Sequence, residues 1–156
     1  MKTTIAAAAI AVLSLSPAFA LDVKKSAEIP AAPDAVWKTI SEFCSIGQWH
    51  PAVEKCDPSM DGKKSVRTLS LKGGGTIKEE QTEHSDKAMS YSYKILESPL
   101  PVEDYHSTIK VAKSGNGSTV TWIGRFKAKG APNAKAEEVI GGIYDAGLKG
   151  IADKVK

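Results

Sequence analysis

The chain has 156 residues, of which 21 are basic and 18 acidic, and its formal net charge is +3. Lysines and acids alternate along the chain without a basic block, which argues against a nucleic-acid-binding surface. Beyond residue 20, no segment is apolar for long enough to cross a membrane. These features favour a soluble protein with one hydrophobic core.

Residues 1–20 have the pattern of a secretory signal peptide. Lys2 provides a basic start, residues 5–15 form an apolar run, and Ala18-Phe19-Ala20 is a small-x-small cleavage site. The apolar run is too short to span a bilayer as a mature helix. We therefore predict that residues 1–20 are removed and that residues 21–156 form a single domain. The alanine-rich signal is typical of bacteria, which predicts a periplasmic location.

The two cysteines of the chain are Cys44 and Cys56. An oxidising compartment permits a disulfide between them, and the alternative is a pair of buried thiols. No Cys-x-x-Cys pattern or Cys/His ligand spacing indicates redox catalysis or a zinc site. We expect no metal and no cofactor.

The first elements alternate between strand and helix. Residues 22–29 are predicted to form a strand that Pro30-Ala31-Ala32-Pro33 ends. A short helix is predicted from Pro33 to about Phe43, because proline suits the first helical position. A second helical turn is expected over residues 45–49, ended by His50-Pro51 because a residue before proline avoids the helical region.

From residue 52 onward the apolar pattern has period two. It predicts six consecutive strands at residues 52–56, 65–71, 76–83, 89–96, 104–112 and 119–127. Short turns rich in glycine, proline and aspartate separate them, and such turns favour hairpins and an antiparallel sheet.

The last stretch, Asn133 to Val155, is predicted to be one long amphipathic helix with Asn133 as its N-cap. Its apolar residues recur at steps of three and four: Val139, Ile140, Ile143, Tyr144, Leu148, Ile151 and Val155. Gly147 falls inside this apolar arc, where the helix either touches a neighbour closely or leaves room for a pocket.

Together these elements predict an α+β domain. A curved antiparallel sheet of about seven strands would surround the long C-terminal helix, with two short helices after the first strand. A curved sheet closed by a helix often encloses a cavity, and cavities of that kind bind small molecules.

Alternation along the strands assigns side chains to the inner face. Tyr91 and Tyr93, Tyr105, and Trp122 with Phe126 are predicted to point toward the helix. Leu69 shares its face with Arg67, and Ile77 shares its face with Glu79. A three-residue hairpin loop (72–74) would place Leu69 opposite Ile77 and Arg67 opposite Glu79. The resulting ion pair could orient a polar ligand or water, or be a purely structural salt bridge.

Of the three histidines, only His50 is a candidate for catalysis. It lies beside Trp49 near the expected cavity mouth, where a histidine could act as a general base. The alternative is that a histidine before proline simply caps a turn. No nucleophile elbow or phosphate-binding loop is present. We therefore rank a non-enzymatic binding protein first, an enzyme second and an accessory protein acting through its surface third.

Several strings together resemble the polyketide cyclase/dehydrase branch of the START-like (SRPBCC) superfamily. They are Ile29-Pro30-Ala31-Ala32-Pro33-Asp34-Ala35-Val36-Trp37, Gly47-Gln48-Trp49-His50-Pro51, Val66-Arg67-Thr68-Leu69, Glu79, Tyr91-Ser92-Tyr93 and Thr121-Trp122. The resemblance covers the chain after the signal and implies a helix-grip fold with an internal hydrophobic cavity. With its signal, the chain is also similar to the small periplasmic MxaD-type proteins of methylotrophic bacteria.

The resemblance implies a small hydrophobic or amphipathic ligand and, in the narrower comparison, a role accessory to periplasmic methanol oxidation. One alternative is a cyclase-like enzyme that uses a His, Arg and Glu in the cavity. The other is an interaction factor for a dehydrogenase–cytochrome couple, docking through exposed lysines such as Lys78, Lys94 and Lys110. The candidate ligand-binding residues are Trp49, His50, Arg67, Leu69, Glu79, Tyr91, Tyr93, Tyr105, Trp122, Phe126, Tyr144 and Gly147.

Overall fold

The computed structural model describes residues 20–155, so the predicted signal peptide lies, except for its last residue, outside the described part of the chain. The elements, in chain order, are β1 (Leu21–Ile29), α1 (Pro33–Ile40), the 3₁₀ turn η1 (Phe43–Ser45), α2 (Ile46–Trp49), β2 (Val53–Asp61), β3 (Lys64–Leu71), β4 (Thr76–Ser85), β5 (Ser90–Glu97), β6 (Val102–Ser114), β7 (Gly117–Ala128) and α3 (Asn133–Lys154).

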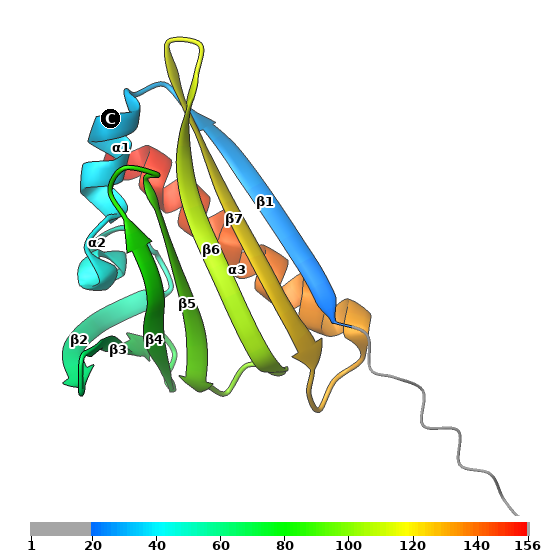
Figure 1. Cartoon of the computed structure of the whole chain (residues 1–156). Coiled ribbons are helices and arrows are strands. Elements are labelled where there is room, and N and C mark those ends of the chain that lie inside the picture. The colour runs from blue at the N-terminus through cyan, green and yellow to red at the C-terminus, as the bar shows by residue number, and fades with distance from the viewer. Residues whose placement is uncertain (1–19, 156) are drawn as a thin grey trace, which may run out of the picture.

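All seven strands form one antiparallel sheet in the order β1-β7-β6-β5-β4-β3-β2. The sheet curves around α3, which packs most closely on β1 and β7, and the C-terminal end of α3 lies beside α1 (Figure 1). This arrangement is the helix-grip fold, and it confirms the predicted architecture. None of the helices described between residues 20 and 155 is long and apolar enough to cross a membrane.

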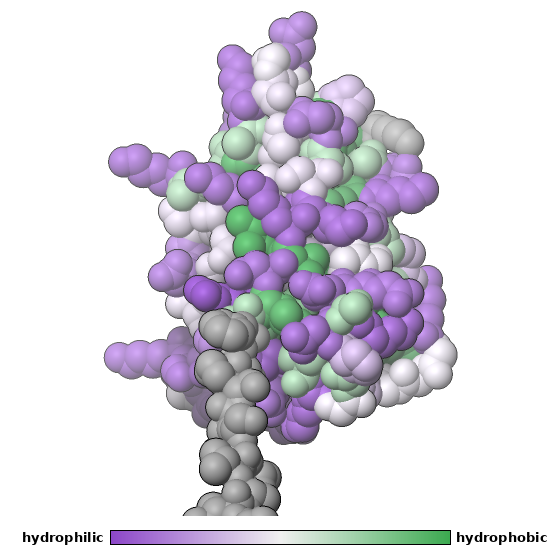
Figure 2. Space-filling model, turned by 90° about the vertical axis from the view of Figure 1, so that its right-hand side faces the viewer, coloured by the Kyte–Doolittle hydropathy of each residue, from purple (hydrophilic) through white to green (hydrophobic). Residues whose placement is uncertain are grey.

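The period-two pattern works because one face of the sheet meets the core and the other meets solvent. The inner aromatic side chains Tyr91, Tyr93, Tyr105, Trp122 and Phe126 are each at most 5% exposed. On the face shown in Figure 2, hydrophobic surface is limited to small areas among hydrophilic side chains. The predicted β3–β4 register is confirmed, since Arg67 pairs with Glu79 and Leu69 with Ile77.

Most ends of helices and strands lie within two residues of the predictions, and two ends differ by more. β2 continues past Cys56 to Asp61, because an edge strand tolerates a proline such as Pro58. The helix predicted to reach Phe43 ends at Ile40, and Phe43 begins the 3₁₀ turn instead.

The predicted N-cap of α3 is also wrong. Asn133 is the first helical residue, and the cap is Pro132, whose φ of −60° and ψ of 151° give the extended backbone that a cap needs. No side chain caps this helix.

Cys44 and Cys56 form a disulfide, with their Cα atoms 5.6 Å apart. Of the two alternatives for these cysteines, the structure has the bonded one. The bond ties the turn η1 to the edge strand β2, and the chain between the two cysteines carries α2.

Candidate functional site

A cavity of about 220 Å³ lies between the sheet and the first half of α3. For scale, an engineered apolar cavity of about 150 Å³ holds a benzene molecule. The space therefore suits a single ring with short substituents. Its walls are Ile46, His50, Ala52 and Val53 from the α2–β2 segment, Leu69, Leu71, Ile77 and Glu79 from β3 and β4, Tyr93, Ile95, Tyr105 and Trp122 from β5 to β7, and Ile140 and Ile143 from α3.

The cavity reaches solvent between two turns. Lys72, Gly73 and Gly74 of the β3–β4 turn are exposed, and Leu100 of the β5–β6 turn completes the rim. Gly73, Gly74 and Gly75 have φ values of 93°, 98° and 93°, a left-handed region that favours glycine. The glycines of this turn therefore add no side chains to the rim.

Arg67 and Glu79 form a buried ion pair, with 2.6 Å between Arg67 Nε and Glu79 Oε2. Arg67 Nη1 also donates to the carbonyl oxygen of Phe43, and the guanidinium carbon lies 3.9 Å from the centre of the Phe43 ring and 5.1 Å from that of Tyr93. Burial alone lowers the pKa of Arg67, but the Glu79 carboxylate together with Tyr91 and Tyr93 outweighs it, so the pKa is raised. Glu79 lines the cavity and Arg67 lies behind it, so the cavity meets the carboxylate rather than the guanidinium.

A network of hydroxyl groups lies at one end of the cavity, in which Tyr93 and Tyr105 line the cavity and Tyr144 and Ser107 lie behind them. The Tyr105 and Tyr144 oxygens are 2.5 Å apart, Tyr144 lies 3.0 Å from the Ser107 oxygen, and Tyr93 lies 3.5 Å from Tyr105. Trp122 Nε1 donates to both Tyr93 and Ser107, at 3.0 and 2.9 Å. Burial raises the pKa of Tyr144 to about 12 and the pKa values of Tyr93 and Tyr105 well above 10, so all three phenols stay neutral.

Both ring nitrogens of His50 are bonded to backbone groups. Nδ1 accepts the N–H of Ala52 at 3.2 Å, so the ring proton sits on Nε2, which donates to the carbonyl oxygen of Ile143 at 3.0 Å. Burial lowers the pKa of His50, with a smaller contribution from the Arg67 charge. His50 is therefore a neutral link between α3 and the start of β2, and it has no free nitrogen to take a proton from a ligand.

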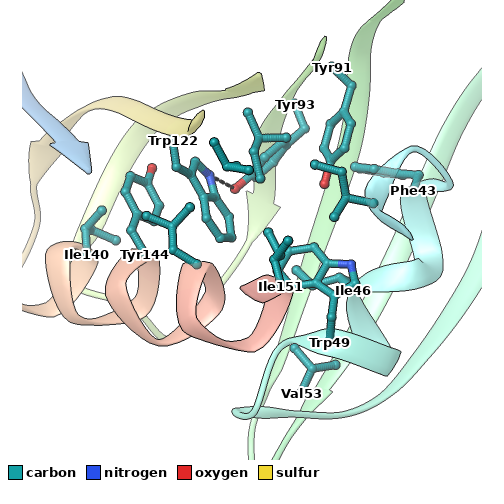
Figure 3. Close-up of a cluster of buried hydrophobic side chains, with 14 of the residues drawn as sticks. Phe43, Ile46, Trp49, Val53, Tyr91, Tyr93, Trp122, Ile140, Tyr144 and Ile151 are labelled. Carbon is teal, nitrogen blue, oxygen red and sulfur yellow. Dashed lines mark hydrogen bonds between the residues drawn. The ribbon is translucent and has the colours of Figure 1, made fainter. Parts of the chain in front are cut away.

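The predicted site residues fall into two groups. His50, Leu69, Glu79, Tyr93, Tyr105 and Trp122 line the cavity, whereas Trp49, Arg67, Tyr91, Phe126, Tyr144 and Gly147 lie outside its lining. Figure 3 shows several of these side chains packed with Phe43 and Ile151. The rings of Trp122 and Tyr144 stack with centres 4.6 Å apart and planes 9° from parallel.

Gly147 makes a close contact and opens no pocket. A Cβ atom there would lie 2.6 Å from the Trp122 ring and 2.8 Å from the His50 ring. A Cβ at Gly150 would overlap the carbonyl oxygen of Trp49. The helix therefore needs glycine at both positions in order to approach α2 and β7.

The candidates from sequence left out most of the aliphatic wall: Ile46, Val53, Leu71, Ile77, Ile95, Leu100, Ile140 and Ile143. The alternation had already placed Ile77 and Ile95 on the inner face, and the helical period had placed Ile140 and Ile143 toward the sheet. Among residues 20–155, no cluster of three or more potential metal ligands occurs.

The family model described as polyketide cyclase/dehydrase and lipid transport matches residues 20–156. The structure of the protein XoxI from Bacillus cereus is 32% identical, with a TM-score of 0.81 over 86% of this chain and 94% of that chain. An uncharacterised protein from Bacillus thuringiensis, also 32% identical, has a TM-score of 0.80 over 86% of this chain and 98% of that chain.

More distant structures share the fold alone. The Zhui aromatase/cyclase from Streptomyces sp. R1128 is 15% identical, with a TM-score of 0.72 over 88% of this chain and 94% of that chain. No curated protein sequence matches this chain.

Proposed function

We propose a ligand-binding function for this chain, which belongs to the polyketide cyclase/dehydrase and lipid transport family. Its ligand is a small hydrophobic or amphipathic molecule that enters the cavity without chemical change. The observation that carries this proposal is the 220 Å³ space with aliphatic walls and a few fixed polar groups, since binding pockets have this composition. The size favours a molecule of one ring over a folded polycyclic chain.

Binding is better supported than a cyclase-type reaction. A general base needs a nitrogen or oxygen within reach of the substrate proton. Both nitrogens of His50 are held by the backbone, at Ala52 and Ile143. Arg67 is 1% exposed and its charge is directed to Glu79 and Phe43. Two of the three residues nominated for catalysis, His50 and Arg67, are thus fully engaged by structural partners, which leaves Glu79 as the single candidate for a base among them.

The test uses two tryptophan substitutions at neighbouring positions. Ile95 lines the cavity, whereas the next residue, Leu96, is 39% exposed on the other face of β5. Ile95→Trp should fill the cavity and weaken binding of ethylbenzene and 4-ethylphenol at least about tenfold, since its ring occupies their volume. Leu96→Trp should bind them as the wild type does. Isothermal titration gives the affinities, and thermal unfolding shows that both variants fold.

Two outcomes would contradict the proposal. One is a wild-type protein that binds neither probe and carries no small molecule in native mass spectrometry. The other is an Ile95→Trp variant that binds both probes as tightly as Leu96→Trp does.

We also propose that the protein is located in the periplasm. The signal-like pattern of residues 1–20 and the disulfide between Cys44 and Cys56 support export to an oxidising compartment. Export is tested by fractionating bacteria that produce the full chain: a processed, disulfide-bonded form in the periplasmic fraction supports it, and an unprocessed cytoplasmic form contradicts it.

A role beside a periplasmic dehydrogenase or cytochrome in methanol oxidation is also part of the proposal. It rests on the resemblance to MxaD-type proteins and on the exposed Lys110 of the outer sheet face. Of the other lysines considered, Lys94 pairs with Glu80 at 3.3 Å and Lys78 is half-buried. If the protein docks through charge, its effect on the electron-transfer rate should fall steeply with added salt. A rate that ignores salt would contradict charge-driven docking.

A further inference from the structure

The direction of the hydrogen bonds around Ser107 determines what the cavity offers a ligand. Ser107 has one hydroxyl proton, and it donates that proton to the carbonyl oxygen of Ile123 at 2.8 Å. Its contact with Tyr144 at 3.0 Å must therefore be donated by Tyr144. The Tyr144 oxygen is then left as an acceptor.

The hydroxyl protons of Tyr105 and Tyr93, on the cavity wall, are directed in the same way. Because Tyr144 has used its proton, its 2.5 Å bond to Tyr105 is donated by Tyr105. The Tyr105 proton thus points away from the cavity, and the Tyr105 oxygen has lone-pair capacity on the cavity side. Tyr93 accepts from Trp122 and directs its own proton toward Tyr105 across 3.5 Å.

The remaining donors at this end of the cavity are also engaged. The His50 Nε2 proton goes to Ile143, the Trp122 Nε1 proton to Tyr93 and Ser107, and the Arg67 Nε proton to Glu79. Glu79 Oε2 accepts that proton, and an ionised carboxylate is an acceptor at both of its oxygens. The fixed polar atoms here are therefore acceptors: the carboxylate oxygens of Glu79 and the oxygens of Tyr93 and Tyr105.

The lining has a single lysine, Lys72, and it lies on the exposed rim, where water screens its charge. A carboxylate ligand pushed into the cavity would bring a second anion toward Glu79 and would find no unpaired donor. A hydroxyl or amine would find acceptors already oriented. Unpaired buried polar groups weaken binding strongly, so this difference should dominate the selectivity.

We propose that the cavity selects apolar molecules of about one ring whose polar end is a hydrogen-bond donor, and that it rejects carboxylates of the same size. This inference rests on the proposed binding function and names the chemical class of its ligand. The carboxylate of Glu79 and the hydroxyl oxygen of Tyr105 are the groups that receive the donor.

The test compares four probes of similar size by isothermal titration at pH 7. They are 4-ethylphenol as a neutral donor, 4-methylbenzylamine as a cationic donor, 4-methylbenzoate as an anion and ethylbenzene as the apolar reference. We expect 4-ethylphenol to bind about tenfold tighter than ethylbenzene, and 4-methylbenzoate to bind at least about tenfold more weakly than 4-ethylphenol. The amine and the phenol together show whether charge on the donor matters.

Two tyrosine variants provide a matched pair. Tyr105→Phe removes an acceptor of the cavity wall and should weaken 4-ethylphenol about fivefold while leaving ethylbenzene unchanged. Tyr91→Phe removes the hydroxyl of an equally buried tyrosine that does not line the cavity and has no hydrogen-bond partner in the described residues. It should leave the affinities for all four probes unchanged.

The outcomes separate this inference from the function on which it rests. If 4-methylbenzoate binds as tightly as 4-ethylphenol, or if Tyr105→Phe has no more effect than Tyr91→Phe, the donor preference is overturned and the binding function stands. If none of the four probes binds, the inference is overturned, and if native mass spectrometry also shows no bound small molecule, the binding function is overturned with it.

Discussion

The two halves of α3 bury their inner faces in opposite ways. From Gly147 onward the helix is in direct contact with its neighbours, since Trp122, His50 and the Trp49 carbonyl occupy the space above its glycines, and Ile151 is fully buried. In the first half, Ile140 and Ile143 face the cavity instead. The same helix thus packs closely in its C-terminal half and lines a cavity in its N-terminal half.

The difference shows how a small domain can keep a cavity and remain folded. A void forfeits the contacts that its lining would otherwise make, so other parts of the core must supply the stability. Here the C-terminal half of α3 packs against α1, α2 and the sheet with glycines at its closest approaches. We expect substitutions in the packed half to act on stability, and substitutions around the cavity to act on binding.

The largest expected effect lies beside the cavity, where Arg67 joins Phe43 to Glu79. Arg67→Met should lower the free energy of unfolding by about 4 kcal/mol, because Glu79 would remain buried without its partner. The control is Arg125→Met, which breaks an exposed ion pair with Asp22 and should cost less than about 1 kcal/mol. Urea unfolding measures both, and equal losses would show that the buried pair has no special role.

A smaller effect is expected within the packed half. Gly150→Val should lower the free energy of unfolding by about 3 kcal/mol, because its side chain would overlap the backbone of Trp49. Gly142→Ala in the same helix has open space around the new methyl group and should raise the free energy by about 1 kcal/mol. If both substitutions raise the free energy of unfolding, the C-terminal half of α3 does not pack closely at Gly150.

The smallest effect is the pH dependence from His50, which touches both the packed half and the cavity. Burial lowers its pKa from 6.5 in the folded state, so the unfolded chain binds the proton more readily. The stability from neutral His50 is therefore complete above pH 6.5 and falls as the pH drops toward the lowered pKa, by up to about 1.4 kcal/mol per pH unit.

Urea unfolding between pH 7 and pH 5 tests this contribution. His50→Gln should flatten the slope of stability against pH in this range, because the titrating group is gone. His106→Gln, at an exposed site on the outer face, should leave the slope as it is. An unchanged slope in His50→Gln would assign the acid sensitivity to other groups.

The fold could be predicted from the sequence because the local sequence patterns agree with the tertiary structure. Period-two alternation identified the strands, and the β3–β4 turn fixed the register that sets Arg67 opposite Glu79. Strand ends were less predictable, because β2 extends over exposed residues that carry little apolar signal.

The candidate site was harder to predict. Alternation along a strand tells which face of the sheet a side chain is on, but not where along the axis of α3 that side chain lies. Tyr91 and Tyr93 share one face of β5, yet only Tyr93 reaches the cavity. Gly147 lay on the correct face of α3, and only the positions of Trp122 and His50 decide that its space is filled. The hydrogen bonds that occupy His50 involve the backbone of Ala52 and Ile143, which leaves no trace in side-chain identity.

The disulfide between Cys44 and Cys56 has a consequence for how molecules reach the interior. It closes the chain around α2 into a covalent ring, and Ile46, His50 and Val53 of that ring form one wall of the chamber. Because the disulfide holds this wall to the edge strand β2, the wall cannot move away from the sheet. Molecules must therefore enter and leave beside this wall, between the glycines that follow β3 and the proline-flanked turn at Leu100.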